Sequence, residues 1–101
     1  VQVSDGEVRF EGVPVGLDGR NASPGPAQLY FRPHELEIVE DGAGIAGVVT
    51  ASRRVEARRR VELDVGRQKT RVEIELPAET GASTGQRIVF RPRAWKLFSA
   101  H

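Results

Sequence analysis

Apolar and charged residues alternate most regularly over residues 59–65 and 69–76. A period of two is that of a β-strand with one face buried and the other in water. Between the two segments lies a turn-forming stretch, Gly66-Arg67-Gln68. The pattern therefore predicts an antiparallel hairpin. Its apolar face would carry Val61, Leu63, Val65, Val72, Ile74 and Leu76, and its charged face Arg60, Glu62, Asp64, Arg71, Glu73 and Glu75.

The tripeptide Phe-Arg-Pro occurs twice, at residues 31–33 and 90–92, with an offset of 59 residues. Proline cannot donate to a sheet ladder, and it biases its predecessor towards an extended backbone. Each copy therefore predicts a strand that ends at the proline, turns a corner and leads into another strand, although two strands could also end alike by chance. The expected strands are 27–32, 37–39, 86–91 and 93–98, with a single helical turn at 33–36.

The remaining segments add short strands separated by glycine and proline. Residues 1–17 predict two short strands with a turn at Gly12, or one strand with a bulge there. Residues 45–55 predict a long strand, whose small residues indicate bending or close approach of another backbone. Loops and turns are expected at 18–26, 40–44, 56–58 and 77–85.

No segment shows a helical period longer than one turn, so the short strands predict an all-β barrel or sandwich. The natural size is a small OB-like antiparallel β-barrel of about five to seven short strands, with little or no helix. At 101 residues the chain is long enough for one modest core, so we expect a single domain over residues 1–101.

Composition narrows the class of protein. Apolar residues make up 39% of the chain and charged residues 29%, which is typical of a soluble globular domain. No apolar run approaches the roughly 20 residues of a membrane helix, and no signal peptide is recognisable. The absence of cysteine excludes disulfides and fits a cytosolic origin. Because the chain begins with Val1, we expect a fragment of a longer protein.

The net charge of +1 is unevenly distributed. Residues 1–45 hold eight acidic residues and three arginines, a net charge of −5, whereas residues 53–71 hold eight basic and three acidic residues, a net charge of +5. The basic segment could bind an oxyanion or a nucleic acid, because guanidinium groups donate paired hydrogen bonds to oxyanions. The alternative is a solvated sheet face on which cross-strand ion pairs balance the charges, and we favour this interpretation.

The residue patterns of common catalytic sites are missing. The chain has no GxxxxGK[ST] phosphate loop. Its two histidines, His34 and His101, cannot form a His-rich metal site, and Ser52, Ser83 and Ser99 lack a plausible histidine and aspartate constellation. We therefore assign no catalytic, cofactor-binding or metal-binding residue and expect no enzyme activity in this chain.

Two polar residues flank Pro33 at a predicted strand end. Arg32 and His34 either contact a ligand or partner at the rim of the barrel, or they have structural roles. In the structural interpretation Arg32 covers the barrel edge and His34 caps the turn. Trp95, the only tryptophan, is expected to fill the bottom of the barrel rather than to bind a ligand.

Residues 29–38, Leu-Tyr-Phe-Arg-Pro-His-Glu-Leu-Glu-Ile, resemble the first motif of transport-associated OB (TOBE) domains. These are the C-terminal regulatory domains of importer-type ABC ATPases. The long Gly-Val-Val strand, the arginine-rich hairpin and the closing Phe-Arg-Pro-Arg-Ala-Trp-Lys-Leu-Phe of residues 90–98 are most similar to the ATP-binding subunits of sulfate/thiosulfate importers. The resemblance covers residues 27–99, and residues 1–26 carry no specific motif.

The resemblance implies a longer parent protein that hydrolyses ATP with Mg and drives sulfate import through a membrane permease. That parent would lie on the cytoplasmic face of the bacterial inner membrane. The present chain would be its cytoplasmic, non-catalytic accessory domain, without ATP or Mg of its own, and would contact its own nucleotide-binding domain and a second copy of the subunit. Sulfate or a related oxyanion is a candidate ligand. The residues expected to make anion or partner contacts are Arg32, His34, Arg53, Arg54 and Arg91.

Two other functions are compatible with the pattern of residues. One is a stand-alone OB module that binds an anion or an oligosaccharide. The other is an OB module that binds single-stranded nucleic acid. The acidic first half argues against this last function, and so does the lack of aromatic residues between Phe31 and Phe90, because single-strand readers need stacking platforms. We therefore expect no nucleic-acid partner.

Overall fold

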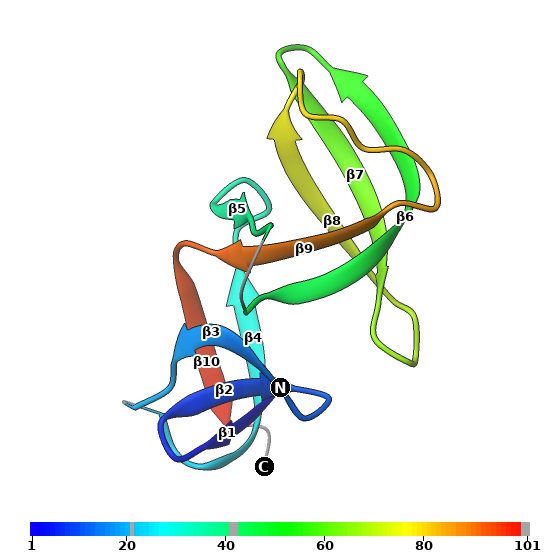
Figure 1. Cartoon of the computed structure of the whole chain (residues 1–101). Helices are drawn as coiled ribbons and strands as arrows, with labels where there is room; N and C mark the ends of the chain where they lie inside the picture. Colours follow the sequence, from blue (N-terminus) through cyan, green and yellow to red (C-terminus); the bar gives the residue numbers. More distant parts are fainter. Residues whose placement is uncertain (21, 41–42, 100–101) are drawn as a thin grey trace. The chain divides into compact units, whose positions relative to one another are not determined.

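The computed structural model describes residues 1–20, 22–40 and 43–99, and within these segments every regular element is a β-strand (Figure 1). The strands form two five-stranded sheets. The order in the first sheet is β10 (Trp95–Ser99), β4 (Gly25–Phe31), β1 (Gln2–Ser4), β2 (Glu7–Phe10) and β3 (Val13–Asp18). The order in the second sheet is β5 (Leu36–Ile38), β9 (Arg87–Pro92), β6 (Ile45–Val55), β7 (Arg58–Val65) and β8 (Thr70–Pro77).

The chain divides into two compact units. The first comprises Val1–Ile45 together with the chain from Phe90 onward, and the second comprises Ala46–Val89. Each unit buries its own set of apolar side chains. In the first unit these are Val3, Val8, Val15, Leu17, Ala27, Leu36, Ile45 and Phe90. In the second they are Val49, Val61, Leu63, Val65, Ile74, Leu76 and Ile88.

The first unit begins with a three-stranded meander of β1, β2 and β3. Glu11 and Gly12, at φ values of 52° and 81°, form the two-residue turn between β2 and β3. Positive φ at both central residues is the type I′ geometry that matches the twist of a hairpin. Strand β4 pairs with both β1 and β10, and the ring of Phe31 on β4 packs 5.6 Å from that of Phe90, measured between ring centroids.

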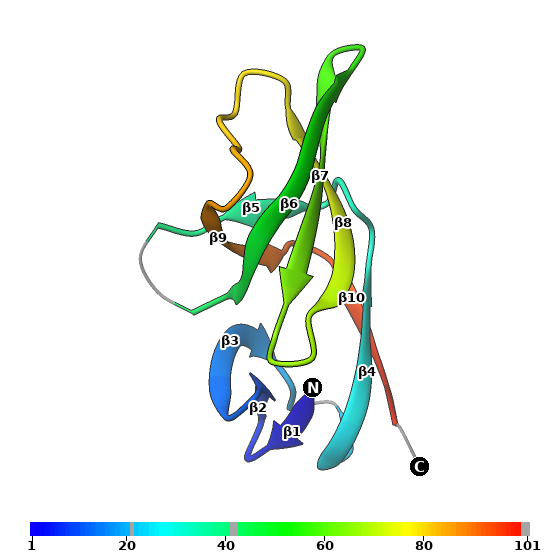
Figure 2. The ribbon, with the colours of Figure 1, turned by 90° about the vertical axis from the view of Figure 1, so that its right-hand side faces the viewer.

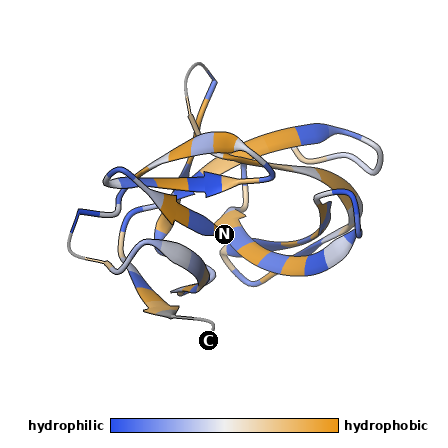
Figure 3. Cartoon of the chain, turned by 90° about the horizontal axis from the view of Figure 1, so that it is seen from below, coloured by the Kyte–Doolittle hydropathy of each residue, from blue (hydrophilic) through white to orange (hydrophobic). Residues whose placement is uncertain are grey.

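The second unit consists largely of two consecutive hairpins, β6–β7 and β7–β8. These three strands lie side by side (Figure 2). One of the two sheets curls into half a barrel. Hydrophobic and hydrophilic residues alternate along the ribbons in Figure 3. We call the face that carries Val61, Leu63 and Ile74 the inner face of this sheet, because these side chains are fully buried, and the opposite, charged face the outer face.

Strand β6 approaches β7 closely near its start. A Cβ atom on Gly47 would lie 3.1 Å from Leu63 Cβ and 3.1 Å from Val65 Cγ2. The register between the strands shifts between Val49 and Ala51, which marks a β-bulge. The same Cβ atom on Gly47 would lie 3.3 Å from the backbone oxygen of Asp64, which confirms the prediction that the small residues of this strand indicate bending or close approach of another backbone.

The predicted fold class is confirmed, because the described residues form a small, all-β, OB-like fold of antiparallel sheets. Two details differ. The described residues form ten strands rather than five to seven, and three of them, joined by two-residue turns, lie in residues 2–18, where we expected one or two. Residues 32–35 form a β-turn, closed by a hydrogen bond of 3.1 Å from Glu35 N to Arg32 O, rather than a helical turn. The predicted single domain over residues 1–101 stays a prediction.

Candidate functional site

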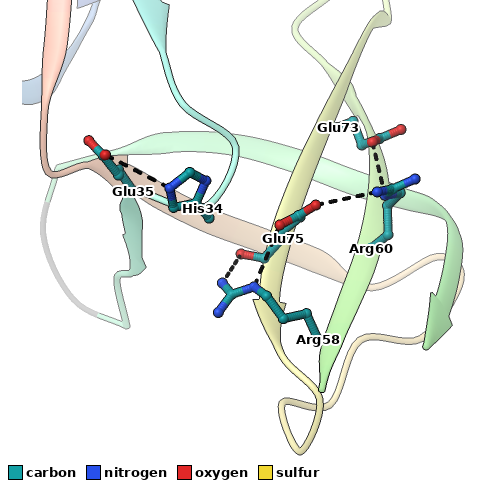
Figure 4. A network of polar contacts seen from close by, with 6 residues as sticks. All are labelled: His34, Glu35, Arg58, Arg60, Glu73 and Glu75. Carbon is teal, nitrogen blue, oxygen red and sulfur yellow. Dashed lines mark hydrogen bonds and ion pairs between the residues drawn. The ribbon is translucent and has the colours of Figure 1, made fainter. Parts of the chain in front are cut away.

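The β-turn after β4 brings two of the five candidate contact residues together. Arg32 Nη1 lies 3.5 Å from Glu35 Oε1, and His34 Nε2 lies 3.8 Å from the same oxygen (the histidine contact is drawn in Figure 4). Both Arg32 and His34 are exposed. Arg32 therefore forms an ion pair with a carboxylate of the same turn.

A groove of about 480 Å³ lies beside this turn in the first unit. Its lining includes Tyr30, Arg32 and Trp95. Trp95 is only half buried and also lines a second groove, so it does not fill an interior as we expected. Tyr30 packs edge to face against Phe98 with ring centroids 5.3 Å apart, and both residues are more than half exposed, at 54% and 52%. This aromatic pair was not predicted from the sequence, although β-strand alternation places both side chains on one face of β4 and β10.

Arg91 is already bound to a carboxylate. It lies directly opposite Glu37 in the pairing of β5 with β9. Its Nη2 and Nε atoms donate to Glu37 Oε1 at 2.8 and 3.1 Å. These hydrogen bonds lower the pKa of the Glu37 carboxyl. A second anion would therefore have to compete with Glu37 for the guanidinium group of Arg91.

The register of the β6–β7 hairpin places arginine opposite arginine twice. Arg53 pairs with Arg60, and Arg54 pairs with Arg59. Successive residues of a strand point to opposite faces, so the first pair belongs to the outer face and the second to the inner face. The sequence alone did not identify Arg59, because its position opposite Arg54 follows only from the register.

On the outer face, four residues form a network that we call the outer charge network: Arg58, Arg60, Glu73 and Glu75 (Figure 4). Glu75 lies 3.6 Å from Arg58 and 3.4 Å from Arg60, and Arg60 Nε lies 3.2 Å from Glu73 Oε1. The last contact is an ion pair without hydrogen-bond geometry, since Arg60 Nε has no hydrogen-bond partner. The predicted balance of charges by cross-strand pairing is confirmed on this face.

The inner face of the same hairpin has a different chemistry. Arg54 Nε donates to the carbonyl of Glu56 at 3.1 Å. Arg59 donates from Nε to the carbonyl of Ala78 at 3.4 Å and from Nη1 to Ser52 Oγ at 3.2 Å. All three acceptors are neutral, so we call Arg54 and Arg59 the inner arginine pair. Arg53, on the outer face, is exposed and forms no ion pair with the described residues.

Across residues 1–20, 22–40 and 43–99, no three His, Cys, Asp or Glu side chains gather where they could hold a metal ion. Those segments also contain no helix with the length and apolar character needed to cross a membrane. His101 lies outside the described residues. The five candidate contact residues stay predictions. Arg32, His34 and Arg91 lie next to carboxylates, whereas Arg54 donates to a backbone carbonyl and Arg53 forms no ion pair with the described residues.

Known proteins match this chain along nearly its whole length. A family model of the TOBE-like domain matches residues 39–93. The chain is 49% identical over 100 residues to the sulfate/thiosulfate import ATP-binding protein CysA 1 of Rhizobium meliloti (strain 1021). This match covers 97% of the chain and 29% of that protein. A protein of the same name, CysA, from Brucella melitensis biotype 1 is 53% identical over 102 residues, with 99% of the chain and 28% of that protein covered.

A further relative, CysA 2 of Rhizobium meliloti (strain 1021), is 54% identical over 101 residues. That match covers 97% of the chain and 27% of the relative. The chain therefore spans less than a third of the length of these relatives. The matching part is their C-terminal region.

Proposed function

Because the chain belongs to the TOBE-like domain family, we propose that it is the accessory domain of the ATP-binding subunit of a sulfate-type ABC importer. In this proposal the domain is non-catalytic and regulates the subunit through protein contacts. The observation that carries the proposal is the extent of the matches. Relatives named as sulfate/thiosulfate import ATP-binding proteins match 97–99% of this chain, which corresponds to only 28–29% of their own length.

In this proposal, ATP hydrolysis belongs to the rest of the parent protein. The ATP site of a P-loop ATPase contains a GxxxxGK[ST] segment, and the 101 residues contain none. The ATP and Mg of the parent would therefore be held outside this chain. The parent would couple hydrolysis to import through a permease, which this domain would meet only indirectly, on the cytoplasmic face of the bacterial inner membrane.

A second copy of the subunit is the partner that we propose for direct contact. Strand β10 is at the edge of its sheet, and an edge strand offers unpaired backbone groups to another chain. The exposed aromatic pair of Tyr30 and Phe98 lies on β4 and β10 and adds apolar area there. Aromatic residues are enriched in protein interfaces, which supports this region as the contact surface.

The test is the mass of the 101-residue chain in solution, measured by sedimentation and light scattering with and without sulfate. We expect a dimer, weakened by a Phe98→Ser substitution. Val13→Ser is a matched control, since Val13 is also exposed but lies at the start of β3. A chain that stays monomeric at high concentration, with or without sulfate, would refute self-association. Packing against the nucleotide-binding domain would then be the remaining role.

The stand-alone anion-binding function has one observation in its favour, the inner arginine pair. Both guanidinium groups donate only to neutral acceptors, whereas those of Arg60 and Arg91 contact carboxylates. An anion site would also serve the sensing of sulfate by the accessory domain. The oligosaccharide and nucleic-acid functions have no comparable support.

A further inference from the structure

The inner arginine pair is an electrostatic anomaly in the second unit. Side chains directly opposite each other on antiparallel strands have Cβ atoms about 4.5–5.5 Å apart, and like charges at such positions are destabilising. Arg54 and Arg59 occupy directly opposite positions. The neighbouring pair of Arg53 with Arg60 is relieved because Arg60 contacts Glu73 and Glu75. No ion pair with a described carboxylate relieves the inner pair.

The inner pair still has donors available. A guanidinium group carries five N–H donors. Arg54 uses one of them, on the carbonyl of Glu56, and Arg59 uses two, on Ala78 and Ser52. Arg54 is exposed and Arg59 is half buried, so solvent reaches the pair. The bonds that Arg59 makes also fix its orientation, so little side-chain freedom would be lost when a ligand binds.

We propose that Arg54, Arg59 and the hydroxyl of Ser52 bind a small tetrahedral oxyanion, with sulfate as the ligand in this protein. Two planar guanidinium groups can each donate a pair of hydrogen bonds to such an anion, and the hydroxyl can donate one more. A divalent anion would also cancel the repulsion within the pair. The choice of sulfate rests on the proposed function, but anion binding itself can be measured without any transporter.

The surroundings favour a small anion over a nucleic acid. Further along the inner face, Val61 and Leu76 are buried core residues, so the basic surface ends after one pair of arginines. A nucleic-acid backbone needs a longer track of positive charge. The second unit, Ala46–Val89, also contains no aromatic residue on which a base could stack.

Calorimetric titration of the 101-residue chain with sodium sulfate at low ionic strength tests the proposal. We expect saturable binding of one anion per chain. Arg54→Gln and Arg59→Gln should each weaken it at least about tenfold, the loss expected when charge-assisted hydrogen bonds are removed. The matched control is Arg53→Gln, which removes the same charge one residue away on the other face, and it should weaken binding less than about twofold.

Arg54→Gln is the decisive variant, because Arg54 is exposed and makes a single hydrogen bond to a backbone carbonyl. Its unfolding midpoint should match that of Arg53→Gln, so that lost binding is not lost folding. Titrations with phosphate and acetate distinguish a tetrahedral oxyanion from any small anion. Phosphate should bind comparably and acetate much more weakly.

Three results would overturn the proposal: no saturable sulfate binding, equal losses in Arg53→Gln and Arg54→Gln, or acetate binding as tight as sulfate binding. A second measurement, the sulfate response of ATP hydrolysis in the full-length parent, tests the proposed accessory function. If Arg54→Gln abolishes sulfate binding but leaves the sulfate response of ATP hydrolysis in the full-length parent unchanged, the site is correct and the sensing role is wrong. If the wild-type chain binds no sulfate but still dimerises, only the site fails.

Discussion

Replacing Gly16 with alanine should destabilise the protein more than the same change at Gly12. Both glycines lie at positive φ, 78° and 81°. Placing an L residue at such a φ lowers the free energy of unfolding by roughly 1–2 kcal/mol. Alanine also restricts the unfolded chain, which offsets about 0.4–1 kcal/mol of that loss. Because a Cβ atom on Gly12 would meet nothing within 4 Å, Gly12→Ala should cost about 1 kcal/mol of unfolding free energy.

Gly16 carries an additional steric penalty. A Cβ atom there would lie 3.0 Å from the carbonyl oxygen of Ala43 and 3.1 Å from both Cδ and Nη1 of Arg91. The backbone carbonyl can yield little, and Arg91 can move only by disturbing its hydrogen bonds to Glu37. Overpacking of this kind costs about 1–3 kcal/mol. The total loss for Gly16→Ala should therefore be about 2–4 kcal/mol.

Guanidinium chloride unfolding of both variants measures the difference. Near the midpoint of thermal unfolding, each kcal/mol should correspond to a shift of roughly 4–8 °C for a chain of this size. A second readout is the pKa of Glu37, which should rise towards its usual value when Arg91 is displaced. Equal losses of stability in the two variants, with the Glu37 pKa unchanged, would refute the close approach at Gly16.

Three further predictions concern single side chains. Truncating Phe90, which is 1% exposed, to alanine should lower the free energy of unfolding by about 3–5 kcal/mol, and truncating Phe98, which is 52% exposed, by about 1 kcal/mol. Equal losses in denaturant unfolding would contradict this. The pKa of Glu37 is lowered from its usual value of 4.5, so its ionised carboxylate stabilises the folded protein at any pH above 4.5. This contribution to stability is lost as the pH falls through the lowered pKa of the folded state. Arg91→Gln should therefore reduce the acid dependence of stability, and an unchanged acid profile would exclude the pair. Glu75→Gln should lower the free energy of unfolding by about 1 kcal/mol at low salt and by less at high salt, because Glu75 contacts two arginines. A loss of stability that does not depend on salt would contradict an electrostatic origin.

Local patterns of the sequence predicted most of the strands. The long strand was predicted at 45–55 and lies at Ile45–Val55, and the hairpin predicted at 59–65 and 69–76 lies at Arg58–Val65 and Thr70–Pro77. Alternation succeeded there because one face of each strand is buried. It failed at β1, whose three residues are too few to show a period. There the pairing with β2 and β4 defines the strand.

The partners of the candidate arginines depend on pairings between distant residues. Arg91 and Glu37 are 54 residues apart, so only the alignment of β5 with β9 reveals that this arginine is already paired. The register of β6 against β7 includes a bulge near Ala51, and a slip of one residue would move every later side chain to the other face. The sequence could therefore identify the arginine-rich segment, but it could not say which of its members lie opposite carboxylates.

The distribution of charge around the β6–β7 hairpin limits which function its arginines can serve. On the outer face the acceptors are Glu73 and Glu75, so an added anion would meet two carboxylates and gain little. On the inner face every acceptor of the arginine pair is a carbonyl or a hydroxyl, so an added anion would not have to displace a carboxylate from either arginine. The net charge of +5 over residues 53–71 is therefore not spread evenly over the hairpin. Arginines on the outer face are largely neutralised by carboxylates, whereas the inner arginine pair is not. Since a strand reverses the direction of its side chains at every residue, adjacent arginines such as Arg53 and Arg54 have different surroundings, and a binding role has to be assigned to them one residue at a time.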